Sequence, residues 1–138
     1  MTSQKIPNAW SCLPTAFAMA IGCSVQSFIE EIGHDGSEIV WPDNPEPMCH
    51  RGFCFQECIL VLLKMGLTAT EVSRDVGHYP SIASIDIVVS FHEAFDYYLK
   101  STKGVVAGRT SRCGHAVAYD HGTYNSYDFT PETLWIIK

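Results

Sequence analysis

The sequence predicts an α+β domain, with helices in its N-terminal part and an antiparallel sheet in its C-terminal part. Hydrophobic residues recur with helical spacing up to about residue 100, and after Gly104 they alternate with the two-residue period of strands. The chain has 138 residues, of which 46% are hydrophobic. This length fits one compact domain, residues 1–138, and this composition excludes a disordered chain.

Three helices are expected in the first half of the chain. Residues 12–21 are apolar on all sides, and Pro14 lies in the first turn, where its missing N–H is harmless. A second helix begins after Ser24, which can cap it, and ends at Gly33. A third helix, about 55–65, is again apolar on most faces. We therefore expect the first and third helices to be buried.

A long loop separates the second helix from the third. Residues 34–52 contain three prolines and two glycines, and only residues 38–41 can form a short extended piece. Loops of this length are usually functional or mobile. Residues 68–73, after the third helix, alternate as a strand does.

A fourth helix and four strands are expected in the second half. Ser90 and Glu93 form a capping box that predicts the start of the helix, and Phe91, Phe95 and Tyr98 are assigned to its core face. The strands are expected at 105–109, 115–119, 123–127 and 133–137, with a hairpin turn at 120–122 joining the middle two.

The charge balance excludes two classes of partner. The 15 acidic and 9 basic residues give a net charge of −6, and the basic residues are scattered, so neither nucleic acid nor an anionic membrane is an expected partner. No window approaches the roughly 18 apolar residues of a membrane span. Residues 16–23 resemble the apolar part of a signal peptide, but a single Lys5 and several polar residues precede them, so we expect no leader.

The six cysteines are interpreted as free thiols of a reduced, cytoplasmic protein. Cys23, Cys54 and Cys58 are interpreted as packing residues, and Cys49 and Cys113 stay unassigned. A zinc site made of Cys49, His50, Cys54 and Cys58 is not expected, because the spacing is not that of paired zinc ligands. No cofactor and no metal are predicted.

Cys12 is the cysteine expected to be reactive. It stands at the start of a helix, where unpaired N–H groups and the helix dipole favour the thiolate, although a buried, inert cysteine is the alternative. His115 opens an apolar strand directly after a glycine, a rigid and accessible position for a general base. If the hairpin turns on residues 121–122, Asp128 lies across from His115 and can orient its ring, whereas Asp120 faces the other way.

An acyl-transfer reaction also needs hydrogen-bond donors for the oxyanion. The backbone N–H of Cys12 and a side-chain amide just upstream can supply them, and Asn8 and Gln4 are the candidates. Asn8 is nearer to Cys12, and its alternative interpretation is a plain turn residue.

The order of Cys12, His115 and Asp128 resembles the papain-like cysteine peptidases, and more narrowly the C39-like peptidase family. The matching segments are residues 12–16, 114–117 and 127–128. The resemblance implies a papain-like fold, with N-terminal helices packed on a C-terminal antiparallel sheet, and a Cys-His-Asp triad acting on a peptide or amide bond. The sequence departs from the family pattern at Ile6, where the family has its oxyanion glutamine, and at Phe129, where it has a proline.

Stand-alone bacterial and phage proteins of this type share Gly-His-Asp-Gly-Ser and Arg-Gly-Phe segments, which are residues 33–37 and 51–53 here. No activity follows from these shared segments. The resemblance to the papain-like fold, in which the nucleophile helix faces a groove covered by loops, implies that Trp10, His34, Asp35 and Gln56 line the substrate cleft; the alternative is that the polar residues of the loop are turn and cap residues. The expected partner is a peptide, protein or small-molecule substrate. A catalytically inactive module that binds a peptide or small metabolite in the cleft is the alternative function.

Overall fold

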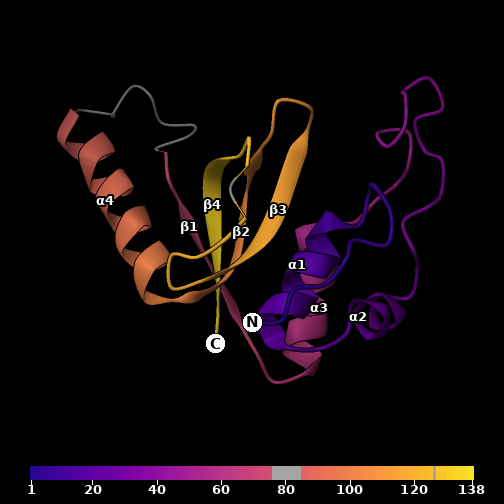
Figure 1. Cartoon of the computed structure of the whole chain (residues 1–138), viewed down its shortest axis with the longest axis horizontal. Coiled ribbons are helices and arrows are strands. Elements are labelled where there is room, and N and C mark those ends of the chain that lie inside the picture. The colour runs from indigo at the N-terminus through magenta and orange to yellow at the C-terminus, as the bar shows by residue number, and fades with distance from the viewer. Residues whose placement is uncertain (76–84, 126) are drawn as a thin grey trace. The chain divides into compact units, whose positions relative to one another are not determined.

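The computed structural model describes residues 1–75, 85–125 and 127–138, without the side chains of residues 85–88. Four helices and four antiparallel strands confirm the α+β class within these residues (Figure 1). Contacts along the chain divide it into two compact units, Met1–Thr68 and Ala69–Lys138. The expectation that residues 1–138 form one domain stays a prediction.

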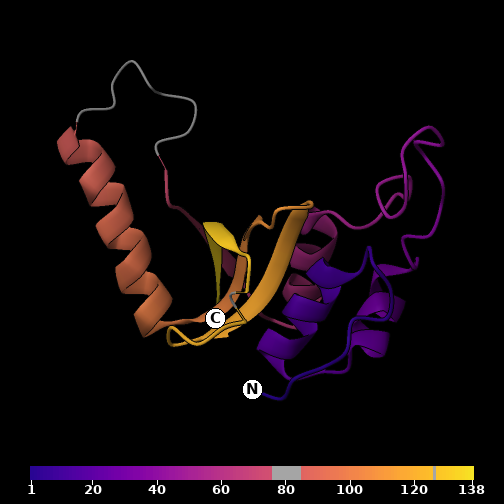
Figure 2. The same cartoon turned by 45° about the horizontal axis from the view of Figure 1, so that its top comes forward.

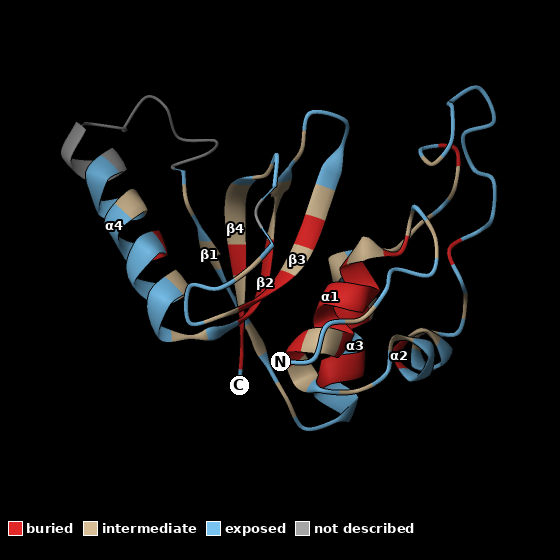
Figure 3. Ribbon diagram, viewed as in Figure 1, coloured by how far each residue is buried: buried red, intermediate tan, exposed pale blue. Residues whose placement is uncertain are grey.

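The first unit contains α1 (Cys12–Ile21), α2 (Val25–Ile32) and α3 (Phe55–Lys64), close to the predicted ranges. The Ser24 hydroxyl caps α2 by accepting a hydrogen bond from the Ser27 N–H at 3.1 Å. Seven of the ten residues of α1 are buried, so this helix forms the centre of the unit (Figure 3).

The loop between α2 and α3 contains little regular structure. An isolated antiparallel bridge joins Ile39 to His50, which agrees with a short extended piece near residues 38–41. The backbone N–H of Arg51 donates to the Glu38 carbonyl at 2.6 Å, and the N–H of Gly52 donates to the Gly36 carbonyl at 2.9 Å. These bonds bring the two ends of the loop together.

The second unit contains α4 and a four-stranded antiparallel sheet. The elements are β1 (Ala69–Ser73), α4 (Ile85–Ser101), β2 (Lys103–Arg109), β3 (Gly114–Asp120) and β4 (Thr130–Ile137), and the strand order is β1-β4-β2-β3. The core consists of Phe95 from α4 with Val106, Tyr119 and Leu134 from the sheet. Figure 2 shows α4 beside the sheet that it packs against.

Two predictions about α4 are wrong. The helix begins at Ile85, so Ser90 lies inside it and the capping-box prediction of its start fails. The mostly apolar residues 85–89 before Ser90 are already helical. Their preference for the helix outweighs the start signal of the Ser90–Glu93 capping pattern. Phe95 is buried as predicted, but Phe91 and Tyr98 are 36% and 40% exposed, so of these three side chains only Phe95 belongs to the core of the second unit.

The predicted strand at 123–127 is also wrong in the residues described there. The expected tight turn exists, with Asp120 bridged to Thr123 and positive φ at His121 and Gly122. Beyond Thr123 the chain leaves β3, whose ladder partner is β2. The last strand is correspondingly longer than predicted and begins at Thr130.

In the part of the chain that the structure describes, no single helix combines the length and the hydropathy needed to cross a membrane. The pair α1 and α2 passes the same test only when taken together, and a bend of 116° separates these two helices.

Candidate functional site

Cys12 is the first residue of α1, and its side chain is half-buried. Ser11 precedes it as the N-cap residue and is fully buried, but its hydroxyl donates to Asn8 Oδ1 at 2.6 Å and does not cap the helix. The first turn of α1 contains no acidic residue. The positive end of the helix dipole favours negative charge at Cys12.

The two oxyanion candidates lie at opposite ends of α1. The carbonyl oxygen of Asn8 accepts hydrogen bonds from the Trp10 N–H at 3.2 Å and from Ser11, so its NH₂ group points away from these partners and can donate elsewhere. The amide of Gln4 instead donates to the Cys23 carbonyl at 2.7 Å and accepts from the Val25 N–H at 2.9 Å. A ten-residue helix spans about 15 Å, so Gln4 does not fit the oxyanion site of Cys12.

His34 is anchored at both ring nitrogens. Its Nδ1 accepts from the Gly36 N–H at 3.0 Å, so Nε2 carries the proton and donates to Glu57 Oε1 at 2.7 Å. Glu57 also accepts from Arg51 Nη2 at 2.7 Å and from the Cys54 N–H at 3.0 Å, and Arg51 Nη1 contacts His34 Nε2. His34 is therefore a structural anchor here rather than an available base.

The environment of Glu57 strongly favours its ionised form. Burial raises the pKa of this carboxyl, but the hydrogen bonds from Cys54, His34 and Arg51 outweigh burial and lower the pKa to about 2. Arg51 and Glu57 were not among the predicted site residues. The Arg-Gly-Phe resemblance was the one signal in the sequence that pointed to this region.

The two shared segments of the resemblance meet in the structure. The Phe53 ring stacks on His34 with centroids 5.0 Å apart. A pocket of about 430 Å³ lies at this junction, and its wall is formed by His34, Asp35, Gly36, Ser37, Glu38 and Arg51. Apart from Gly36, the lining residues carry polar or charged groups that can hydrogen-bond a ligand.

Trp10 is bound to the same loop. Its indole N–H donates to the Asp35 carbonyl at 2.8 Å, and its ring lies 3.9 Å from the His50 ring. The structure therefore brings together Trp10, His34 and Asp35, three of the four residues expected at a substrate cleft. The fourth, Gln56, is exposed in the first turn of α3 and does not line the pocket.

The remaining cysteines differ widely in exposure. Cys58 is fully buried, and burial raises the pKa of its thiol, as do the nearby Glu57, Cys54 and Cys12, which agrees with a packing role. Cys23 is half-buried, and burial also raises the pKa of its thiol. Cys54 is exposed, so its interpretation as a packing residue is wrong; as the N-cap of α3 it lies at the edge of the unit.

His115 lies on β3 opposite Gly108 and is half-buried. Burial lowers the pKa of its imidazole, so the ring is neutral at neutral pH, which is the form that a general base needs. Phe129 meets this ring edge to face, with centroids 5.9 Å apart.

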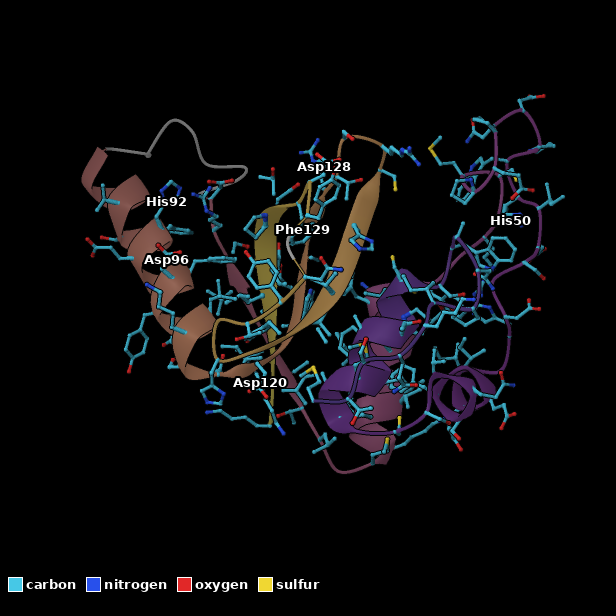
Figure 4. The ribbon with its side chains drawn as sticks, viewed as in Figure 1. His50, His92, Asp96, Asp120, Asp128 and Phe129 are labelled. Atoms are coloured by element: carbon cyan, nitrogen blue, oxygen red, sulfur yellow. The ribbon has the colours of Figure 1, made fainter. Side chains whose placement is uncertain are left out.

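Asp128 directly precedes Phe129 and lies in a turn, with φ of 50° (Figure 4). Its carboxylate accepts from the Ser111 N–H at 3.1 Å and from the Ser111 hydroxyl at 2.5 Å. These two bonds lower the pKa of Asp128. The register that was expected to place Asp128 across from His115 does not form, because residues 123–125 and 127 are not a strand. Asp120, which was expected to face away from His115, bonds with His121 Nδ1 at 2.6 Å.

The candidate residues are divided between the two units, with Cys12 in the first and His115 and Asp128 in the second. Comparison of the chain with protein-family models, with curated proteins and with solved structures finds no match.

Proposed function

We propose that the protein is a cysteine-dependent hydrolase or acyltransferase of the papain-like, C39-like type that acts on a peptide or amide bond. The observation that carries the proposal is the position of Cys12 at the start of the buried helix α1, whose first turn contains no acidic residue. The neutral, half-buried imidazole of His115 supplies the second function that thiol chemistry needs.

In the proposed reaction, His115 takes the proton of the Cys12 thiol, and the thiolate attacks the carbonyl carbon of the substrate. The backbone N–H of Cys12 and the amide of Asn8 stabilise the oxyanion. Collapse of this intermediate breaks the C–N bond, and the imidazolium returns its proton to the leaving amine. The acyl group, now held as a thioester, passes to water or to another acceptor, and the thiol is regenerated.

Asp128 enters the proposal as a positioning residue. Its two hydrogen bonds to Ser111 fix the turn that presents Phe129 to the His115 ring. An aromatic contact of this kind limits the rotation of the imidazole, so loss of the Asp128 carboxylate is expected to loosen the base without removing it.

Selective alkylation tests the proposal. The full, reduced chain is treated with iodoacetamide at pH 6, and the modified thiols are identified by mass spectrometry. Cys54 and Cys113 are matched controls, because both thiols are more exposed than Cys12. We expect Cys12 to react at least tenfold faster than either of them, since the thiolate is the reactive form. The proposal fails if Cys12 reacts no faster than these two exposed thiols.

A binding module without catalysis is the second candidate, and the polar pocket of about 430 Å³ at the His34 loop favours it. This candidate predicts ordinary reactivity of Cys12 and a ligand whose affinity depends on Arg51. The alkylation experiment separates the two functions, because only the hydrolase requires an activated Cys12.

A further inference from the structure

Three metal-ligating side chains converge in the loop between α2 and α3, and neither the thiol chemistry nor the pocket uses them. The carboxylate of Glu46, the sulfur of Cys49 and a ring nitrogen of His50 each offer one ligand atom, and these three atoms lie within 4.8 Å of one another. We propose that Glu46, Cys49 and His50 form a zinc site in this loop, with a solvent molecule as the fourth ligand.

The local backbone explains the convergence. The Met48 N–H donates to the Pro45 carbonyl at 2.9 Å, and the His50 N–H donates to the Pro47 carbonyl at 3.2 Å. These successive turns place residues three and four positions after Glu46 on the same side of the chain. The carbonyl of Cys49 also accepts from the backbone N–H groups of Val40 and Trp41, at 3.0 and 3.2 Å, which fixes the loop at the ligand itself.

The His50 ring is held in the orientation that zinc ligation requires. Its Nδ1 lies 2.6 Å from the Ser37 carbonyl, so Nδ1 carries a proton and donates it, while Nε2 faces Glu46 Oε2 across a hydrogen bond whose proton the metal would replace. The Trp10 ring packs 3.9 Å from the imidazole, and the His50 side chain is only 9% exposed. Histidine ligands of metals are commonly fixed in this way, with the second nitrogen bonded to a carbonyl.

Zinc requires His50 Nε2 and Glu46 Oε2 to move apart. Ligand atoms about 2.0 to 2.3 Å from a tetrahedral zinc ion lie about 3.3 to 3.8 Å apart. His50 Nε2 and Glu46 Oε2 are 2.5 Å apart, so this pair must separate by about 1 Å to admit the ion. The Glu46 side chain is 68% exposed and can make this movement, whereas Cys49 is buried and fixed.

The donor set selects the metal. A thiolate, an imidazole and a carboxylate suit Zn²⁺ better than Mg²⁺ or Ca²⁺, which prefer oxygen ligands only. Binding displaces two protons to solvent: the Cys49 thiol proton, which a sulfur–zinc bond replaces, and the proton of the hydrogen bond between His50 Nε2 and Glu46 Oε2. The sequence spacing argues against a different zinc site, made of Cys49, His50, Cys54 and Cys58. The site proposed here shares Cys49 and His50 with that set, and Glu46 takes the place of the other two cysteines.

The bound ion would cross-link residues in the centre of the loop. Regular secondary structure in residues 34–52 is limited to the bridge between Ile39 and His50, so a structural metal would add cross-links where the chain has few. Ser37 both lines the pocket and bonds His50. Zinc is therefore expected to stiffen one wall of the pocket, whichever function the pocket has.

Cobalt titration of the full, reduced chain tests the proposal, because Co²⁺ bound to a thiolate has a charge-transfer absorption that aqueous Co²⁺ lacks. We expect one Co²⁺ per chain, displaced by Zn²⁺, and loss of the band in Cys49→Ser. Cys54→Ser, which removes an exposed thiol five residues away, is the matched control and is expected to keep the band.

A second variant tests the site independently, in case Cys49→Ser misfolds. Glu46→Gln changes an exposed side chain and should leave the circular dichroism spectrum intact. Loss of an outer-shell partner typically lowers metal affinity by roughly 10- to 100-fold. Because Glu46 is proposed as a direct ligand, Glu46→Gln is expected to weaken Zn²⁺ binding by at least this factor. Failure of the chain to bind one metal ion, retention of the band in Cys49→Ser, or unchanged zinc affinity in Glu46→Gln would overturn the proposal. None of these outcomes depends on the reactivity of Cys12.

Discussion

Glu57 connects the two ends of the α2–α3 loop to the start of α3, and Glu57→Gln tests how much this connection stabilises the protein. The carboxylate accepts from His34, Arg51 and the Cys54 N–H at 2.7 to 3.0 Å. Glutamine keeps the size and one acceptor oxygen but removes the charge. The substitution therefore tests the charge-assisted part of the interaction.

The magnitude follows from the pKa of Glu57. A lowering from 4.5 to about 2 corresponds to about 3 kcal/mol of preference for the ionised form in the folded state. The Arg51 side chain is 41% exposed, and solvent screening reduces its contribution. We therefore expect Glu57→Gln to lower the free energy of unfolding by about 1 to 2 kcal/mol at pH 7.

The pH dependence has a definite sign. Because folding lowers the pKa of Glu57, its stabilisation is complete above about pH 4.5 and is lost as the pH falls towards 2. The difference between wild type and Glu57→Gln should accordingly shrink over this range. Urea unfolding followed by circular dichroism at pH 7, 4.5 and 3 measures it, and Glu31→Gln, an exposed position on α2, is the control. Equal stability of wild type and Glu57→Gln at pH 7, or a difference that persists undiminished at pH 3, would refute the reasoning.

Three further outcomes follow from the packing and titration of particular residues. Gly36→Ala is expected to cost about 1 to 3 kcal/mol in urea unfolding, because φ is +71° and the new methyl would lie 2.9 Å from the Phe53 ring; a smaller cost than 0.5 kcal/mol would count against the described loop. Leu134→Ala should cost about 2 to 5 kcal/mol, since Leu134 is fully buried in the core of the second unit, and a thermal scan showing an unchanged melting temperature would contradict that core. Burial lowers the pKa of His115, so the unfolded chain binds a proton more readily than the folded chain, and the free energy of unfolding should fall as the pH drops below about 6.5. This loss of stability should be weaker in His115→Asn. An identical dependence of stability on pH in the two proteins would argue against a buried His115.

The helices of the first unit could be predicted from the sequence because their signals are local. Ser24 and Gly33 bound α2 by capping chemistry that acts within one turn. The failures in the second unit arise from competition between signals. Residues 123–127 alternate as a strand does, but in the residues described there pairing with β3 stops at the bridge between Asp120 and Thr123.

From the sequence, a site residue could be predicted only where its own position in a secondary-structure element indicates its role. Cys12 could be found from its place at a helix start, and the structure puts it there. The pairing of Glu57 with His34 joins residues 23 positions apart, and no periodicity carries such information. Glu46 could not be predicted as a ligand from the sequence, for a different reason. Its role depends on two turns of an irregular loop and on the Ser37 carbonyl that orients His50, which sequence spacing does not reveal.

In the proposed mechanism Cys12 and His115 act together, although they belong to different units of the chain. The rate of Cys12 alkylation at pH 6, measured in wild type and in His115→Asn, tests it most directly. We expect the substitution to slow the alkylation of Cys12 at least tenfold and to leave the rates of the exposed thiols of Cys54 and Cys113 unchanged. An unchanged rate at Cys12, in a folded His115→Asn protein, would contradict it.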